Sequence, residues 1–292
     1  MTWLVGNKGM LGTQVECLLR EDRRGFFATD RECDITNLEA LRLFARGKKI
    51  DWIVNCSAYT AVDKAESEPD AAFLVNAVGP SNLARTAREC GARLIHISTD
   101  YVFDGNKEGP YTEEDSPCPA NTYGKSKAEG EKLLRETTDA FFIFRAAWMY
   151  GRRGVNFVST MLRLFKERDT ISVVDDQWGT PTYAVDLAAV LLKIIAMDSE
   201  RYGIYHFTND GTTSWYRFAV ELLRQATESA MIDSRCLLRP INSADYPTRA
   251  VRPRNSVLSK EKIKRELGIE GRAWEKALSA HLQELSGERG RR

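Results

Sequence analysis

The sequence predicts an α/β protein with a doubly wound parallel sheet and a smaller C-terminal α/β lobe. Short apolar segments of strand length alternate with longer helical segments through the first half of the chain. A glycine-rich turn directly follows the first apolar segment. The 292 residues, 43% of them hydrophobic, are enough for one large domain or two lobes with a substantial core.

Charge and composition narrow the classes of partner. Lys and Arg number 42 and Asp and Glu number 41, which gives a net charge of +1. This balance argues against a broad nucleic-acid surface, so we expect a small-molecule substrate. The most apolar late stretch, residues 187–197, contains Lys193 and is too short to span a bilayer. We therefore expect no membrane partner.

The cysteines and histidines give no sign of a metal site. Six cysteines are scattered without a CxxC pair, and the three histidines are far apart. The pattern is typical of reduced thiols in a cytoplasmic protein, and no signal peptide precedes the first strand. The sequence predicts no metal, and it leaves a monomer and a homodimer equally open.

The start of the chain resembles a dinucleotide-binding turn. Residues 2–5 form a predicted strand, and the segment GNKGMLG, with Gly6, Gly9 and Gly12, opens a helix to about residue 20. The glycines permit a tight turn, close approach to a pyrophosphate and close packing of helix on sheet. The helix N-terminus offers N–H groups to phosphates. The alternative is a plain turn at a strand–helix junction.

The second strand, residues 25–29, ends at a pair of opposite charges. Asp30 lies about 20 residues beyond the glycine turn, where an acid binds the adenosine ribose. Asp30 favours NADH, whereas Arg31 can pair with the 2′-phosphate of NADPH. The pair predicts use of either cofactor. Asp34 and Ile35 follow, suited to the adenine amino group and ring.

The third strand, residues 51–56, leads into a loop of small residues. Ala58, Tyr59 and Thr60 lie at its carboxyl end, where an open α/β sheet binds ligands, so we expect them beside the middle of the cofactor. A long helix is predicted to begin at Pro69 and to pack on the sheet.

The fourth strand and the next helix carry the candidate catalytic residues. The strand, residues 94–97, runs into Ser98 and Thr99, and a helix entered at residues 121–122 carries Tyr123 and Lys127. Four residues apart, these two side chains share one helix face. A free phenol has a pKa of about 10, and a nearby ammonium is expected to lower it. Thr99 can then hold a carbonyl oxygen while Tyr123 supplies its proton. A lone tyrosine–lysine pair is otherwise a common feature of helix surfaces.

The remaining chain predicts the second lobe. Trp148 follows a strand at residues 141–145 and can offer an apolar face to a sugar. The expected division is a dinucleotide-binding domain at residues 1–150, joined by about 175–202, and a substrate-binding lobe at residues 151–174 and 203–292. Arginines near the C-terminus can bind a diphosphate, but the sequence does not indicate which one does.

Taken together, these segments resemble the extended short-chain dehydrogenase/reductase superfamily. The motifs IVNCSAYTAVDKAESEP, HISTDYVFDG, YGKSKAEGE, FRAAWMYG, NFVSTMLRL, DDQWGTPT and YPTRAVRPRNS occur in family order over nearly the whole chain. The resemblance implies a Rossmann-type sheet and NAD(P)H-dependent reduction of the C4 ketone of a dTDP-linked deoxysugar. It assigns the triad to Thr99, Tyr123 and Lys127. It assigns sugar-nucleotide contacts to Thr99, Asp100 and Trp148. It assigns cofactor contacts to Gly9, Met10, Leu11, Asp30, Asp34, Ile35, Ala58, Tyr59, Thr60 and Ile97. We also expect Tyr123 and Lys127 to contact the cofactor, with Lys127 at the nicotinamide ribose.

Some features depart from the resemblance or leave rivals open. Some bacterial relatives are thought to hold Mg²⁺ between subunits with helix carboxylates, but this chain lacks the second acid pair, so no metal is carried over. One rival is a nucleotide-sugar epimerase or dehydratase, although dehydratases of this type have Glu where this chain has Tyr101. Another is a non-catalytic NADP-binding regulatory subunit, like that of methionine adenosyltransferase.

Overall fold

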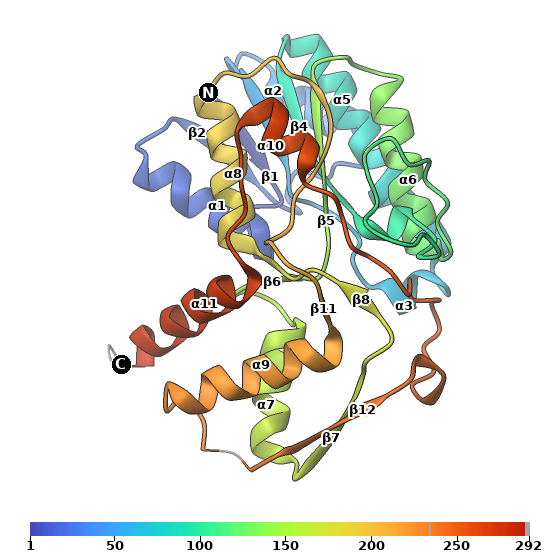
Figure 1. The fold of residues 1–292 in the computed structure, drawn as a ribbon. Helices are drawn as coiled ribbons and strands as arrows, with labels where there is room; N and C mark the ends of the chain where they lie inside the picture. The colour runs from blue at the N-terminus through green and yellow to red at the C-terminus, as the bar shows by residue number, and fades with distance from the viewer. Residues whose placement is uncertain (234, 290–292) are drawn as a thin grey trace.

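The protein is built around a six-stranded sheet in which every pair of neighbouring strands is parallel. The computed structural model describes residues 1–233 and 235–289 (Figure 1). The strand order is β10-β5-β4-β3-β1-β2. The bounds are β1 (Thr2–Val5), β2 (Phe26–Thr29), β3 (Trp52–Asn55), β4 (Arg93–Thr99), β5 (Phe141–Ala146) and β10 (Gly203–His206). The predicted doubly wound sheet is confirmed.

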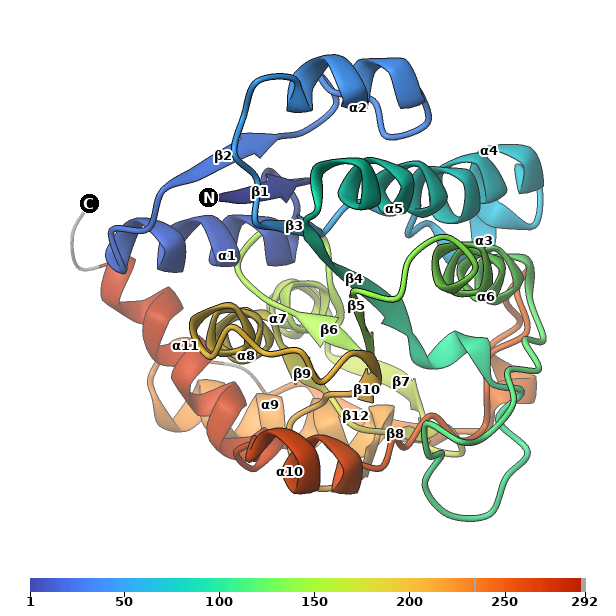
Figure 2. The ribbon, with the colours of Figure 1, turned by 90° about the horizontal axis from the view of Figure 1, so that it is seen from above.

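Helices cover both faces of this sheet, which explains why its strands are apolar on both sides. Leu4 and Val54 pack toward α1 and α8, whereas Trp3 and Ile53 pack toward α2 and α5. Figure 2 shows α1 and α8 on one side and α2, α5 and α6 on the other. Their bounds are α1 (Met10–Glu21), α2 (Leu38–Ala45), α3 (Val62–Ala65), α4 (Pro69–Phe73), α5 (Gly79–Cys90), α6 (Thr122–Arg135), α8 (Ala184–Ala196) and α10 (Glu261–Leu267). The strand order reverses between β1 and β3, the place where such sheets bind ligands.

The predicted long helix from Pro69 is interrupted by a π-helical segment. This segment, η1 (Leu74–Val78), lies between α4 and α5 and contains Asn76. Gly130 of α6 packs so closely that an added Cβ would lie 2.0 Å from the Asn76 carbonyl oxygen. The Asn76 side chain accepts from Tyr59 N at 2.8 Å and donates to Tyr59 O at 3.0 Å. The irregular turn therefore fixes the loop that follows β3, and π-bulges often occur at such functional places.

A second core lies below the sheet in Figure 1 and belongs to the smaller lobe. Its apolar residues come mainly from α7, α9 and α11, and three two-stranded pairs complete it: β7 with β12, β8 with β11 and β6 with β9. The bounds are β6 (Met149–Tyr150), α7 (Phe157–Glu167), β7 (Thr170–Val174), β8 (Trp178–Gly179), β9 (Thr182–Tyr183), β11 (Thr213–Ser214), α9 (Trp215–Glu228), β12 (Leu237–Ile241) and α11 (Trp274–Arg289).

The structure differs from the expected division at residues 203–292. Strand β10 pairs with β5 at the edge of the central sheet, and Tyr205 packs in the same core as α1 and α8. Ile263 and Leu267 of α10 also join that core. The reason is that α8 crosses the sheet face and returns the chain to its edge, so the next strand extends the sheet.

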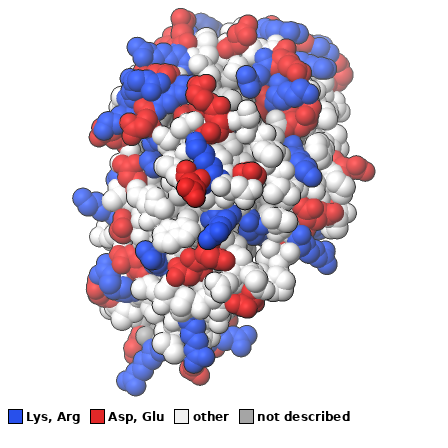
Figure 3. Space-filling model, turned by 45° about the vertical axis from the view of Figure 1, so that its right-hand side comes forward, with Lys and Arg blue, Asp and Glu red and all other residues white. Residues whose placement is uncertain are grey.

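On the face shown in Figure 3, basic and acidic side chains are intermixed around largely uncharged areas. Within the described part of the chain, no helix combines the length and the apolar character needed to cross a bilayer.

Candidate active site

The glycine turn places the N-terminus of α1 beside the loop that follows β3. Gly6 has a φ of +79°, and an added Cβ would lie 2.7 Å from the Ser57 backbone nitrogen. An added Cβ at Gly12 would lie 2.0 Å from the Gly6 carbonyl oxygen. Gly9 is the N-cap of α1 and supplies no side-chain cap. The first N–H groups of the helix therefore stay open to an anion.

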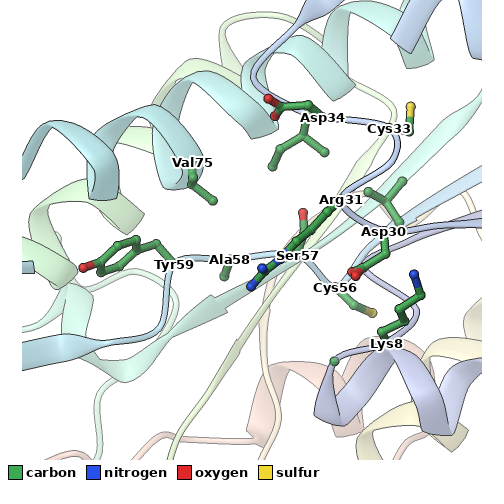
Figure 4. Close-up of a pocket in the computed structure, with 14 residues that line it drawn as sticks. Lys8, Asp30, Arg31, Cys33, Asp34, Cys56, Ser57, Ala58, Tyr59 and Val75 are labelled. Atoms are coloured by element: carbon green, nitrogen blue, oxygen red, sulfur yellow. The ribbon is translucent and has the colours of Figure 1, made fainter. Parts of the chain in front are cut away.

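A pocket of about 820 Å³ lies over this turn (Figure 4). In the figure, Lys8 and Asp30 lie at one end of the pocket and Tyr59 lies at the other. An elongated pocket between a helix N-terminus and the tips of β1, β2 and β3 has the form required for a dinucleotide. Its walls are Val5, Gly6, Lys8, Gly9, Asp30, Arg31, Cys33, Asp34, Ile35, Cys56, Ser57, Ala58, Tyr59 and Val75.

The pocket gathers most of the predicted cofactor residues but not all of them. It includes Gly6, Gly9, Asp30, Arg31, Asp34, Ile35, Ala58 and Tyr59. Seven predicted residues are not among its walls: Met10, Leu11, Gly12, Thr60, Ile97, Tyr123 and Lys127. Leu11 points into the core, and Met10 packs against Gly151, so these two residues offer the pocket their backbone N–H groups.

Sequence reasoning missed several wall residues. Lys8 lies inside the glycine segment and approaches Glu32, with 3.5 Å between Nζ and Oε2. Its position as a basic residue inside a predicted phosphate-binding turn could have identified Lys8 as a wall residue. Val5, Cys33, Cys56, Ser57 and Val75 are apolar or small and gave no such signal.

The stretch predicted to contact adenine is held in place by side-chain hydrogen bonds. Asp34 Oδ1 accepts from the Thr36 backbone and hydroxyl, both at 2.9 Å. Asn82 of α5 donates to Ile35 O at 3.0 Å. Gly79 leaves room for the Ile35 side chain, since an added Cβ would lie 2.4 Å from Ile35 Cδ1. The Asp34 carboxylate and the Ile35 side chain are thus held at one wall of the pocket.

The candidate catalytic residues lie together beyond the tip of β4. Asn121 caps α6 by accepting from Gly124 N at 2.8 Å, and the helix starts at Thr122, directly before Tyr123. Tyr123 and Lys127 are both buried, and the Thr99 hydroxyl is a hydrogen-bond partner of Tyr123. Thr99 also donates to Asp100 Oδ1 at 2.8 Å. The predicted hydroxyl, phenol and amine therefore share one buried cluster.

The electrostatics of this cluster differ from the expectation. Burial raises the pKa of Tyr123, and its hydrogen bond to Thr99 lowers it only in part. Burial also lowers the pKa of Lys127 to about 8. Lys127 is not among the groups that shift the pKa of Tyr123, and its amine donates to Ile97 O at 2.7 Å. Desolvation outweighs the neighbouring charge in this buried arrangement.

Asp100 is buried at the same edge of the sheet. Burial raises its pKa to about 6. Hydrogen bonding from Ser256 and Thr99 lowers this pKa only in part. Among the described residues, no donor meets the geometry of a hydrogen bond to the Oδ2 atom. A buried carboxylate oxygen without a partner is costly unless a ligand supplies one.

Trp148 lies in a strained and partly covered position. Its φ of +48° is in the left-handed region, which a bulky residue rarely adopts. The Trp215 ring stacks on it with centroids 3.6 Å apart and an interplanar angle of 11°. Gly179 gives it room, since an added Cβ would lie 2.6 Å from the indole. Trp148 therefore offers at most one face to a sugar, and strain of this kind is often kept at a ligand site.

The C-terminal segment reaches back to the catalytic cluster. Arg252 donates to the Tyr101 hydroxyl at 2.8 Å and to Asp63 Oδ2 at 2.5 Å. The Tyr101 ring lies edge-on to Tyr123, with centroids 5.7 Å apart. Of the arginines considered for a diphosphate, Arg252 is thus already held beside the candidate catalytic tyrosine.

Comparison with known proteins identifies the family to which the chain belongs. The model of the RmlD substrate binding domain family matches residues 1–286. A dTDP-4-dehydrorhamnose reductase of Aggregatibacter actinomycetemcomitans is 43% identical over 94% of this chain and 96% of that protein.

Two solved structures share the whole fold. The dTDP-4-dehydrorhamnose reductase of Clostridium acetobutylicum has a TM-score of 0.92 and 41% identity, covering 98% of this chain and 100% of that one. That of Bacillus anthracis, in complex with NADP, has a TM-score of 0.91 and 36% identity, covering 97% and 98%. The predicted resemblance is confirmed: the chain belongs to the RmlD substrate binding domain family.

Proposed function

We propose that the chain reduces the C4 ketone of dTDP-4-dehydro-β-L-rhamnose to dTDP-β-L-rhamnose with NADPH or NADH. The observation that carries this proposal is the position of Thr99, Tyr123 and Lys127 at the carboxyl edge of β4, next to a dinucleotide-shaped pocket. The relatives named dTDP-4-dehydrorhamnose reductase support the choice of substrate.

The pocket fits a nicotinamide dinucleotide. The open N-terminus of α1 would hold the pyrophosphate, and a side chain at Gly6 or Gly12 would collide with the backbone that shapes this turn. Asp30 would accept from the adenosine ribose, and Asp34 and Ile35 would hold the adenine. When bound, the cofactor supplies the hydride that reduces the ketone.

The choice between the two cofactors depends on one end of the pocket. Asp30 favours a ribose with a free 2′-hydroxyl, whereas Arg31 and Lys8 favour a 2′-phosphate. The sequence-based prediction compared only Asp30 with Arg31, and Lys8 adds a second positive charge at this end of the pocket. NADPH is therefore expected to be the better substrate, with NADH still accepted.

The residues of the cluster would move and hold the proton. Thr99 would donate a hydrogen bond to the ketone oxygen, and Tyr123 would give that oxygen its proton. The raised pKa of Tyr123 keeps the phenol protonated and ready to act as the acid. Lys127 would contact the nicotinamide ribose and, while charged, stabilise the phenolate that remains.

The sugar would lie against Asp100 and Trp148. The unpartnered Asp100 Oδ2 can accept a hydrogen bond from a sugar hydroxyl. The face of Trp148 that Trp215 does not cover can pack on the deoxysugar.

The two rival functions are less well supported. A dehydratase needs a further acid or base where this chain has Tyr101, and that phenol is engaged by Arg252. A regulatory subunit has no need of a buried tyrosine, lysine and threonine at one strand tip. A cytoplasmic location and a monomer or homodimer remain predictions from the sequence.

The proposal is tested by following oxidation of NADPH and of NADH with the ketosugar made in situ by the preceding enzymes. Oxidation that requires the sugar supports the reductase, and the ratio of the two rates measures the balance of Asp30 against Arg31 and Lys8. Tightly retained NAD⁺ without net oxidation would favour the epimerase or dehydratase. Binding of NADPH without turnover of this or other ketosugars would favour the regulatory subunit.

A further inference from the structure

A buried chain of hydrogen bonds links the loop after β3 to Lys127. The Ser57 backbone N–H donates to Asn55 Oδ1 at 3.0 Å, and the Ser57 hydroxyl donates to the same oxygen at 2.5 Å. Asn55 Nδ2 lies 3.0 Å from His96 Nδ1, and His96 Nε2 lies 3.3 Å from Lys127 Nζ. His96 is 0% exposed and Lys127 is 1% exposed, so no solvent competes for these contacts.

This chain fixes the tautomer of His96. A backbone N–H can only donate, so the oxygen of the Asn55 amide must face Ser57 and its NH₂ group must face His96. His96 Nδ1 is then the acceptor. A neutral imidazole carries one proton, so that proton is on Nε2, which faces Lys127.

The fixed tautomer has a consequence for the amine of Lys127. An ammonium group has three donors and no acceptor, so a charged Lys127 meets the His96 N–H donor to donor. A neutral amine has a lone pair and accepts that hydrogen. Resting on the proposed reductase function, we propose that His96 is a positioning residue that favours the neutral amine and so limits the pH range in which Lys127 carries its charge.

The other ionisable groups near Lys127 are Glu131 with its partner Arg145, His96 itself, and Tyr123. Glu131, one turn further along α6, favours the charged amine, but its carboxylate is paired with Arg145 of β5 at 2.6 and 2.9 Å. Burial and the charge of Lys127 hold the pKa of His96 well below its usual value, which keeps the imidazole neutral. Tyr123, on the same helix, keeps its proton to higher pH than Lys127 because its pKa is raised.

The tautomer can be measured without any turnover. In protein labelled with ¹⁵N-histidine, two-bond proton–nitrogen spectra separate the two neutral tautomers, and loss of signal in His96→Phe assigns His96 among the three histidines. We expect an Nε2–H imidazole at neutral pH, with shifts that change as Lys127 loses its proton at higher pH. An Nδ1–H tautomer or an imidazolium at neutral pH would overturn the proposal.

Two variants then test the effect on Lys127. Asn55→Asp keeps an acceptor for Ser57 but offers an oxygen to His96, which moves the imidazole proton to Nδ1 and turns Nε2 into an acceptor. His96→Phe removes the N–H and keeps a ring. Both substitutions should make Lys127 keep its charge to higher pH. The pH at which kcat falls on the alkaline side should therefore rise by about one unit.

Controls separate the proposal from simple structural damage and from the proposed function. Asn55→Asp also adds a negative charge. The double variant Asn55→Asp, His96→Phe measures the effect of that charge when it is compared with His96→Phe. The pH shift of the double variant should be smaller than the sum of the shifts of the two single variants. Lower kcat in both single variants with an unmoved alkaline limb would mean a purely structural role and would overturn the proposal. If the protein lacks reductase activity, the proposed function fails, while the His96 spectra and their alkaline transition still decide the tautomer and its link to Lys127.

Discussion

The cofactor side and the sugar side of the site are built in different ways. Every wall residue of the dinucleotide pocket lies within the first 75 positions, and all but Val5 of β1 and Val75 of η1 lie on the turns that follow β1, β2 and β3. The sugar side joins Tyr101, Trp148, Trp215 and Arg252, which come from both lobes. Backbone turns shape the first side, whereas long-range packing shapes the second. The cofactor side should therefore tolerate changes in the C-terminal lobe, and the sugar side should not.

The largest effect is expected where the two sides meet. Tyr123→Phe removes the proton donor and should lower kcat about 10²- to 10⁴-fold, the usual contribution of a general acid. The affinity for NADPH, measured by fluorescence titration, should change little because Tyr123 is not a wall of the pocket. Near-normal turnover would remove Tyr123 from the mechanism, and loss of NADPH binding would show that the two sides are not separable here.

A pH-dependent effect is expected from Asp100 on the sugar side. Its folded pKa is raised to about 6, above the ordinary 3.8, so the folded state holds its proton more tightly than the unfolded state. Stability is therefore lost as pH rises from about 4 to about 6, by about 3 kcal/mol for a shift of this size. Asp100→Asn should recover part of this above pH 6 while weakening sugar binding.

The measurement for Asp100 is urea unfolding across this pH range, in parallel for both proteins. The difference in unfolding free energy should grow from pH 4 to pH 6 and then stay constant. A constant difference at all pH values would show that Asp100 does not titrate in this window.

On the cofactor side, the close contact of α1 with the glycine turn can be broken directly. Gly12→Ala places a Cβ against the Gly6 carbonyl, and the overpacking should destabilise the protein by roughly 1–3 kcal/mol and weaken NADPH binding. Gly287→Ala is the matched control, because Gly287 also lies in a helix but has nothing within 4 Å of an added Cβ. Thermal unfolding and cofactor titration measure both variants, and equal behaviour would contradict the close-packing argument.

The smallest effect is expected from the stacked tryptophans. Trp215→Leu removes the ring that holds Trp148, and since aromatic pairs contribute about 0.5–1.5 kcal/mol, KM for the sugar should rise roughly 2- to 10-fold. Trp215→Phe should restore part of the loss, and kcat and NADPH affinity should stay near normal. An unchanged KM would show that Trp148 holds its strained backbone without Trp215.

The difference between local turns on the cofactor side and long-range packing on the sugar side also explains how much could be predicted from the sequence. The sheet, the glycine turn, Asp30 and the Tyr123–Lys127 pair follow from local spacing and strand periodicity. In the structure, Asp30 lies at the pocket over the glycine turn, and Tyr123 and Lys127 lie on one helix. The π-helical turn at Asn76 packs closely against Gly130 of another helix. No sequence pattern near either residue predicts such a contact.

Buried polar contacts were equally hard to foresee. His96 lies in an apolar strand, so the sequence suggests an ordinary core residue. The structure shows Asn55 and Lys127 in contact with its ring nitrogens. The raised pKa of Tyr123 also depends on the depth of burial, which spacing alone does not give. Membership of strand β10 in the central sheet required the path of α8 across the sheet face.

The central claim is that the cluster at the tip of β4 completes a hydride reduction at C4 of the sugar. The most direct test uses NADPH deuterated at the transferable position of the nicotinamide, with dTDP-4-dehydrorhamnose as substrate and mass spectrometry and proton NMR of the product. The account predicts dTDP-rhamnose with one deuterium at C4, formed in equal amount to the NADP⁺ released. Product without deuterium, or deuterium at another carbon, would contradict it.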